Sequence, residues 1–267
     1  MNAQSQWQFA GSVPENYERY LVPSIFAAWA DDLVEVAALQ PSERVLDIAC
    51  GTGIVARTAA RKLDAGGSVV GLDLSAPMLA VARTAAAAEG VTVEWREGSA
   101  VKLPLRDGEF EQGLQFFPDR PTALGEMYRV LAPGGRVVLS VWRELERSPG
   151  FAVLAEALTR HIGPEAGALM TSGPFALSNI EELRALIAGA RFKDIAIRPA
   201  VRTLRYPSPD EFVLRYAAGS PLASTVAGAD DNARAALLAK ISVKLQSSVD
   251  DQGLAFPIES NIAIARR

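Results

Sequence analysis

From residue 44 onward, short runs of apolar and β-branched residues alternate with longer stretches whose apolar positions recur every three or four residues. This alternation predicts an α/β fold, in which a mostly parallel β-sheet is covered by helices. We expect strands at Arg44–Ile48, Ser68–Asp73, Thr92–Trp95, Phe110–Phe116, Gly135–Trp142, Phe192–Arg198 and Ala255–Ala265. We expect alanine-rich or amphipathic helices at Ile54–Lys62, Pro77–Glu89 and Pro121–Leu131, the last beginning at Asp119 or Arg120.

The segment before the first strand also has a helical pattern. Apolar residues recur at mixed spacings of three and four over Asn16–Leu39, and the pattern stops at Pro41. Later in the chain, "SNIE" (Ser178 to Glu181) and "SPDE" (Ser208 to Glu211) both match the capping box that begins a helix. The second opens a run of helices over residues 207–251, which is too long for a hairpin loop and predicts a lid or extra packing.

Composition and charge narrow the class of protein. A chain of 267 residues with 49% hydrophobic residues can bury the core of one large domain. The net charge of −4 argues against a nucleic-acid partner, and no apolar run approaches the roughly 18 residues of a membrane span. The first twenty residues do not fit a secretory signal, so we expect a soluble cytoplasmic protein. The single cysteine, Cys50, excludes an intrachain disulfide and a multi-cysteine zinc site.

A glycine turn follows the first expected strand. Gly51, Gly53 and Ala56 fit the dinucleotide fingerprint with alanine in its third position, and Asp73 ends the next strand, where it can accept hydrogen bonds from ribose hydroxyls. The pattern therefore indicates a ribose-bearing ligand at the carboxyl ends of the strands. A nicotinamide-dependent oxidoreductase is one interpretation of this pattern.

Asp47 favours a different ligand. A carboxylate at the end of the first strand would repel a diphosphate, whereas it would attract an α-ammonium group and a sulfonium. For unit charges ~4 Å apart at an effective dielectric of ~20, the interaction energy is ~4 kcal/mol, unfavourable for a diphosphate and favourable for a cation. S-adenosylmethionine carries both cations and a ribose, so it fits Asp47 and Asp73 together.

Four stretches carry a family resemblance. "VLDIACGTG" (Val45 to Gly53) and "VVGLDLSAPMLAVA" (Val69 to Ala82) resemble the first two motifs of class I S-adenosylmethionine-dependent methyltransferases. "EGSAVKLPLRDGEFE" and "EMYRVLAPGGRVVLSVW" resemble the later motifs of the small-molecule branch, which includes the ubiquinone and menaquinone methyltransferase-like proteins. The resemblance implies a three-layer Rossmann-like fold with a seven-stranded, mostly parallel sheet, an antiparallel last strand and helical lid insertions. It implies one domain over residues 1–267, with an N-terminal lid (16–39), a cofactor-binding core (44–142) and helical insertions (143–191 and 207–251).

The resemblance also implies roles for the matched positions. Asp47 would anchor the methionine end, Asp73 would hold the ribose hydroxyls, and the tyrosines of the N-terminal helix would fold over the site. The residues expected to bind S-adenosylmethionine are Tyr20, Asp47, Ala49, Gly51, Gly53, Asp73, Leu74, Met78, Ser99, Ala100 and Gln112. No metal site is expected. The lone histidine, His161, is a candidate general base because its ordinary pKa lies near neutrality.

The expected activity is methyl transfer from S-adenosylmethionine to a small-molecule acceptor by in-line displacement. The aromatic residues favour an apolar or aromatic acceptor, and the nucleophile can be oxygen, nitrogen or carbon. Two alternatives stay open, an NAD(P)-dependent oxidoreductase and a non-catalytic S-adenosylmethionine-binding protein. The sequence does not fix the acceptor or the oligomeric state.

Overall fold

Two β-sheets carry the fold in the residues that the computed structural model describes, which are 12–103, 110–111, 114 and 117–267. The first sheet is parallel and has the order β3-β2-β1-β4. Its strands are β1 (Arg44–Ile48), β2 (Ser68–Asp73), β3 (Glu94–Glu97) and β4 (Phe110–Glu111). The second has the order β5-β8-β6, and β8 is antiparallel to both β5 and the short β7. Its strands are β5 (Arg136–Trp142), β6 (Lys193–Tyr206), β7 (Val249–Asp250) and β8 (Gly253–Arg266).

Each expected strand has a counterpart, and the last strand is antiparallel as predicted. The third begins at Glu94 instead of Thr92, and of the expected strand Phe110–Phe116 only Phe110–Glu111 is described as a strand. The expected single seven-stranded sheet is not seen in the described residues, where hydrogen bonding divides the strands into two sheets. The division falls at β4, which lies beside β5 but has only two described residues, Phe110 and Glu111, with which to form a ladder.

The chain forms two compact units. One contains the described part of Phe26–Arg143 together with Leu177–Ala200 and Ser260–Arg267, and we call it the sheet unit. Its helices are α2 (Ala27–Ala37), α3 (Ile54–Ala60), α4 (Ala76–Glu89), α5 (Arg120–Val130) and α8 (Ile180–Gly189). The other, the helical unit, contains residues 12–25, Glu144–Ala176 and Val201–Glu259. Its helices are α1 (Val13–Asn16), most of η2 (Tyr17–Phe26), η4 (Leu145–Arg147), α6 (Pro149–His161), α7 (Pro164–Ser172), α9 (Pro209–Ala218), α10 (Leu222–Ala227), α11 (Asp231–Leu245) and η5 (Gln246–Ser248).

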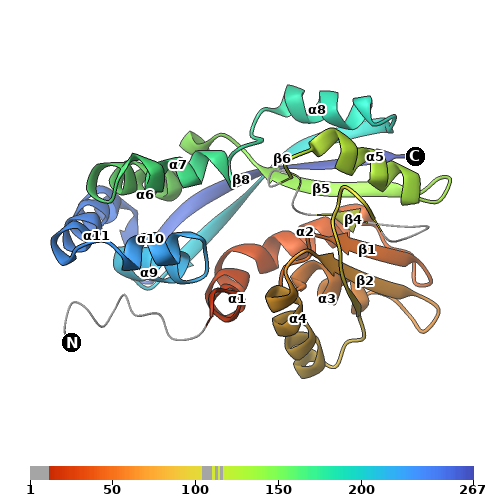
Figure 1. Cartoon of the computed structure of the whole chain (residues 1–267), viewed down its shortest axis with the longest axis horizontal. Helices are drawn as coiled ribbons and strands as arrows, with labels where there is room; N and C mark the ends of the chain where they lie inside the picture. Colours follow the sequence, from red (N-terminus) through yellow and green to blue (C-terminus); the bar gives the residue numbers. More distant parts are fainter. Residues whose placement is uncertain (1–11, 104–109, 112–113, 115–116) are drawn as a thin grey trace. The chain divides into compact units, whose positions relative to one another are not determined.

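Helices cover both faces of the sheet unit. On one face α5 and α8 lie side by side (Figure 1), and their buried apolar side chains pack with Leu46, Ile48 and Leu139 of the strands. Asp47 lies between Leu46 and Ile48 in β1, so its side chain points to the other face, where α3 packs against β1 and β2. The alternation along β1 therefore separates the apolar core from the face that carries the polar residue of the motif.

The helical unit is built around an aromatic core. The ring of Phe151 contacts the rings of Phe175, Phe212, Tyr216 and Phe256 at centroid distances between 5.1 and 5.9 Å, mostly edge to face. All five side chains are buried. These contacts make Phe151 and Phe175 core residues of this unit.

Local signals explain how several helices begin. Ser75 caps α4, and Asp119 caps α5 by accepting the N–H of Thr122 at 3.0 Å. Ser208 caps α9 as predicted, with Pro209 in the first turn. The prediction for α8 was wrong by one residue. Its cap is Asn179 instead of Ser178, because the amide oxygen of Asn179 accepts two backbone N–H groups, those of Glu181 at 2.8 Å and Glu182 at 3.0 Å.

The N-terminal helical segment is confirmed but is not a regular α-helix. Residues Tyr17–Phe26 form a π-helix that contains Pro23, and α2 continues to Ala37. A proline has no N–H to donate and its ring crowds the carbonyl four residues earlier, so a wider turn fits the sequence better than an α-helical one.

Candidate functional site

The glycine turn joins β1 to α3 through residues with left-handed backbone conformations. Ala49, Gly51 and Gly53 have φ values of 55°, 55° and 81°. The turn is closed by the N–H of Gly53, which donates to the carbonyl of Cys50 at 2.8 Å, and it is tied to β2 by the N–H of Cys50, which donates to Leu72 at 3.0 Å. Such a turn leaves backbone N–H groups at the start of α3, where an anionic or polar ligand group can approach.

Asp47 lies beneath this turn and is only 1% exposed. Its Oδ2 accepts the N–H of Ala56 in α3 at 2.9 Å, whereas its Oδ1 is buried and has no hydrogen-bond partner among the described residues. The pKa of Asp47 is raised to about 7, because burial and, to a smaller extent, the charge of Asp73 raise it by more than the hydrogen bond from the Ala56 N–H lowers it. A carboxylate this buried can act on a ligand only through its field or through a bridging water, and its charge changes near neutral pH.

Asp73 fastens the turn to the end of β2. Its Oδ2 accepts the N–H of Gly51 and its Oδ1 accepts the N–H of Ser75, both at 2.8 Å. Each carboxylate oxygen can accept about two hydrogen bonds, so two acceptor positions are left for a ligand. The side chain is half-buried, which leaves these positions within reach of ribose hydroxyls.

The third strand brings further predicted residues to the same edge. The N–H of Gly98 donates to the carbonyl of Asp73 at 3.0 Å, which places Ser99 and Ala100 beside the end of β2. Leu74, directly after Asp73, is 72% exposed, and an apolar side chain this exposed at a candidate site is available to a ligand. Met78 is half-buried in the first turn of α4.

Cys50 behaves as a buried hydrophobe. It is 8% exposed, and burial, with the charges of Asp47 and Asp73, raises the pKa of its thiol well above the ordinary value. A neutral thiol is a poor nucleophile, so Cys50 has a packing role in the turn.

Three predicted residues are not brought to this edge by the contacts described. Gln112 lies outside the described residues. Tyr20 belongs to the helical unit, where its ring receives the guanidinium groups of Arg19 and Arg215 at 5.2 and 5.7 Å. His161 belongs to the last turn of α6 in the same unit, and its Nε2 is buried without a partner among the described residues. The roles given to these residues stay predictions.

Two residues that contact the turn or its anchor Asp73 were not predicted from the sequence. Ser75 holds one oxygen of Asp73 through its N–H and caps α4 through its hydroxyl, and its place before Pro77 was the available signal. Trp95 lies against Gly53 and Gly71, a contact between three elements that sequence spacing does not show. A glycine inside a buried strand, such as Gly71, was the one hint of a close approach.

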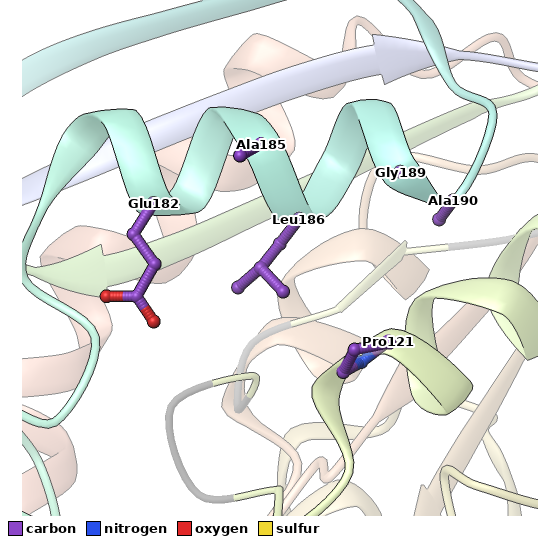
Figure 2. A pocket seen from close by; sticks show the side chains of 6 residues that line it. All are labelled: Pro121, Glu182, Ala185, Leu186, Gly189 and Ala190. Atoms are coloured by element: carbon purple, nitrogen blue, oxygen red, sulfur yellow. The ribbon is translucent and has the colours of Figure 1, made fainter.

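A separate cavity of about 330 Å³ lies between α5 and α8. Its lining is mostly apolar: Pro121, Glu182, Ala185, Leu186, Gly189 and Ala190. Figure 2 shows Glu182 and Leu186 extending from α8 toward the end of α5 that carries Pro121. Because α5 and α8 cover the opposite face of the sheet from Asp47, this cavity is not the glycine-turn site.

The described residues also show whether metal ligands or membrane-spanning helices are present. Among them, no three histidine, cysteine, aspartate or glutamate side chains are grouped so that they could hold a metal ion. In the same part of the chain, no helix has the length and apolar character needed to cross a membrane.

Known proteins resemble this chain in fold or in sequence. The Bacillus subtilis YcgJ protein has a similar fold, with a TM-score of 0.58 and 20% identity over 89% of this chain and 97% of that one. The Thermus thermophilus demethylmenaquinone methyltransferase is 36% identical over 184 residues, which cover 61% of this chain and 80% of that protein. A Synechococcus elongatus 2-phytyl-1,4-naphtoquinone methyltransferase is 34% identical over 132 residues, 47% of this chain and 57% of that protein.

The family model for the ubiE/COQ5 methyltransferase family matches residues 12–176, which contain the glycine turn, Asp47 and Asp73. The match extends over more than half of the chain. The chain therefore belongs to the ubiE/COQ5 methyltransferase family and is an S-adenosylmethionine-dependent methyltransferase.

Proposed function

We propose that this chain methylates a small aromatic acceptor of the quinol or phenol class, with S-adenosylmethionine bound at the glycine turn. The observation that supports this binding site is that Asp73 accepts the backbone N–H groups of Gly51 and Ser75. These two hydrogen bonds fix the turn and leave two acceptor positions of the carboxylate for the ribose. The support for the acceptor class is the identity with relatives named for demethylmenaquinone and phytylnaphthoquinone methylation.

Each residue of the site has a proposed task. Asp73 holds the ribose hydroxyls, and the exposed Leu74 with Met78 lies along the adenine. Gly51 and Gly53 let the backbone approach the ligand, and the buried Asp47 favours the cationic methionine end through its charge. The same proposal includes the finer fold prediction, in which β4 and β5 join the two observed sheets into one seven-stranded surface.

S-adenosylmethionine, when bound at the turn, would supply an activated methyl group to the acceptor's nucleophilic atom by in-line displacement, with S-adenosylhomocysteine as the leaving product. The protein then has to align the two reactants and exclude water. A quinone is electrophilic, so the reduced quinol or its anion is the nucleophilic form. A base is needed to take the acceptor's proton, and His161 keeps its place as a candidate for that task.

The first experiment measures binding of S-adenosylmethionine, S-adenosylhomocysteine, NAD and NADP to the purified protein by isothermal titration. We expect saturable binding of the two sulfur compounds alone. Asp73→Ala should abolish it, because the variant loses both the ribose acceptor and the bond to Gly51. Binding of a dinucleotide with neither sulfur compound would contradict the proposal and revive the oxidoreductase interpretation.

The second experiment tests the acceptor with methyl-labelled S-adenosylmethionine. Reduced naphthoquinols, benzoquinols, phenols, amines and sugars are offered separately, and the expected products are methylated quinols or phenols. Label found only on amines, sugars or protein would reject the acceptor class. Tight binding of the sulfur compounds with no transfer of the label to any acceptor offered would support the non-catalytic alternative.

A further inference from the structure

One row of residues crosses the first sheet directly below the glycine turn. Asp47 in β1 pairs with Gly71 in β2, and Gly71 pairs with Trp95 in β3. Residues paired in a parallel sheet direct their side chains to the same face, so Asp47 and Trp95 share the face on which α3 packs. Gly71 lies between them without a side chain, which leaves a gap in the row.

The ring of Trp95 fills that gap and reaches the turn. A Cβ atom placed on Gly71 would lie 2.4 Å from Cζ3 of Trp95 and 3.2 Å from the sulfur of Cys50. A Cβ atom placed on Gly53 would lie 2.2 Å from Cη2 of the same ring. The indole therefore touches the backbone of β2 and the backbone of the turn at once.

These contacts differ from ordinary core packing of an aromatic residue. The ring lies against two glycines, and one of them, Gly53, has the left-handed φ of 81° and precedes α3. The ring thus supports the backbone of the turn from below, on the face of the sheet that carries Asp47. A displacement of the ring would change the space under Gly53 directly.

We propose that Trp95 is a positioning residue of the cofactor site, which holds the Gly51–Gly53 turn in the conformation that binds S-adenosylmethionine. Gly71 has the matching task of leaving the ring its space. The inference rests on the proposed function, since it assigns a role at the same turn.

The test is a double-mutant cycle with S-adenosylhomocysteine as the probe. The variants are Trp95→Leu, Gly71→Ala and the two combined, and the dissociation constant of each is measured by isothermal titration. We expect each single change to weaken binding about tenfold. Because the two residues are in contact, their effects should not simply add in the double variant. In the double variant, the alanine methyl occupies space that the indole has left, so binding should return to within about threefold of the wild type.

Trp29→Phe is the matched control. Trp29 is a fully buried tryptophan of the same unit, packed edge to face on Trp142 at 5.6 Å. It should lower the melting temperature and leave the dissociation constant within about twofold, because core truncation costs stability alone. Trp95→Phe, which keeps an aromatic ring, should bind better than Trp95→Leu, and it serves the test if the leucine variant does not fold.

Failure of the proposed function and failure of the role of Trp95 give different results. Wild-type protein that binds neither S-adenosylmethionine nor S-adenosylhomocysteine would overturn the proposed function itself. The role of Trp95 would be overturned if the wild type binds and folded Trp95→Leu or Trp95→Phe binds with the same affinity. It would also be overturned if the effects of the two single changes on the dissociation constant simply multiply in the double variant. A Trp29→Phe protein that loses affinity equally would show that general destabilisation explains the effect, and would also overturn it.

Discussion

At the residue scale, the buried carboxylate of Asp47 makes stability depend on pH. Burial raises its pKa from 3.8 to about 7, so the folded state holds a proton that the unfolded chain releases at a lower pH. The stabilisation is complete below about pH 4 and is lost as pH rises toward 7. A shift of about three units corresponds to ~4 kcal/mol of unfolding free energy.

Asp47→Asn isolates this contribution. The amide has the same shape, and its oxygen can still accept the Ala56 N–H, but it does not titrate. Urea unfolding of both proteins at pH 5, 6, 7 and 8 should show the wild type losing stability relative to the variant as pH rises. Parallel curves over this range would mean that Asp47 titrates normally and that its burial has been misjudged.

Gly53 is expected to reject alanine more strongly than Gly134, a second glycine with a left-handed backbone conformation. Gly134 has nearly the same φ, 79° against 81°, but a Cβ atom there meets nothing within 4 Å, whereas at Gly53 it meets Trp95 at 2.2 Å. Gly134→Ala should cost about 1 kcal/mol of conformational strain, and Gly53→Ala roughly 1–3 kcal/mol more for overpacking. Urea denaturation measures both, and equal costs would show that the indole yields to the new methyl group.

The residues that sequence could identify are those whose neighbours are close in the chain. Gly51, Gly53 and Asp73 stand at motif spacings, and the structure joins Asp73 to Gly51 by a direct hydrogen bond. Trp95 could not be found in this way, because its contacts depend on the register of β2 with β3. Register is set by packing across strands, which spacing along one chain does not encode.

At the element scale, the start of α8 gives a direct test of helix capping. Asn179 accepts two backbone N–H groups of the first turn, and Ser178 accepts neither in the described structure. Asn179→Ala should therefore cost about 1 kcal/mol and Ser178→Ala less than ~0.5 kcal/mol. Thermal unfolding of the two variants compares them, and a larger loss in the serine variant would restore the capping box first expected from the sequence.

Elements were predictable where the pattern was strong and less so where it was mixed. β1 and β2 match their predicted bounds, because buried parallel strands are almost continuously apolar. β6 extends to Tyr206, eight residues beyond the predicted end at Arg198. Its exposed arginines and Pro199 hide the second half of the strand, where only Leu204 and Tyr206 are buried.

At the scale of the whole molecule, the two units share strands. β6 begins at Lys193 in the sheet unit and passes to the helical unit at Val201. β8 begins at Gly253 in the helical unit and passes to the sheet unit at Ser260. Unfolding of either unit would remove half of both strands and the ladder that pairs them. This continuity supports the prediction that residues 1–267 are a single domain, which means a single cooperative unfolding transition.

Calorimetry with and without S-adenosylhomocysteine tests that prediction. A single domain should give one peak whose calorimetric and van't Hoff enthalpies agree, and ligand at 100 times its dissociation constant should add about 2.7 kcal/mol, moving the whole peak up by roughly 5–10 °C. If the units instead unfold separately, two transitions will appear and the ligand will move only the one that contains Asp73. That result would divide the chain into two domains and assign the cofactor to the sheet unit alone, since the turn, Asp47 and Asp73 all belong to it.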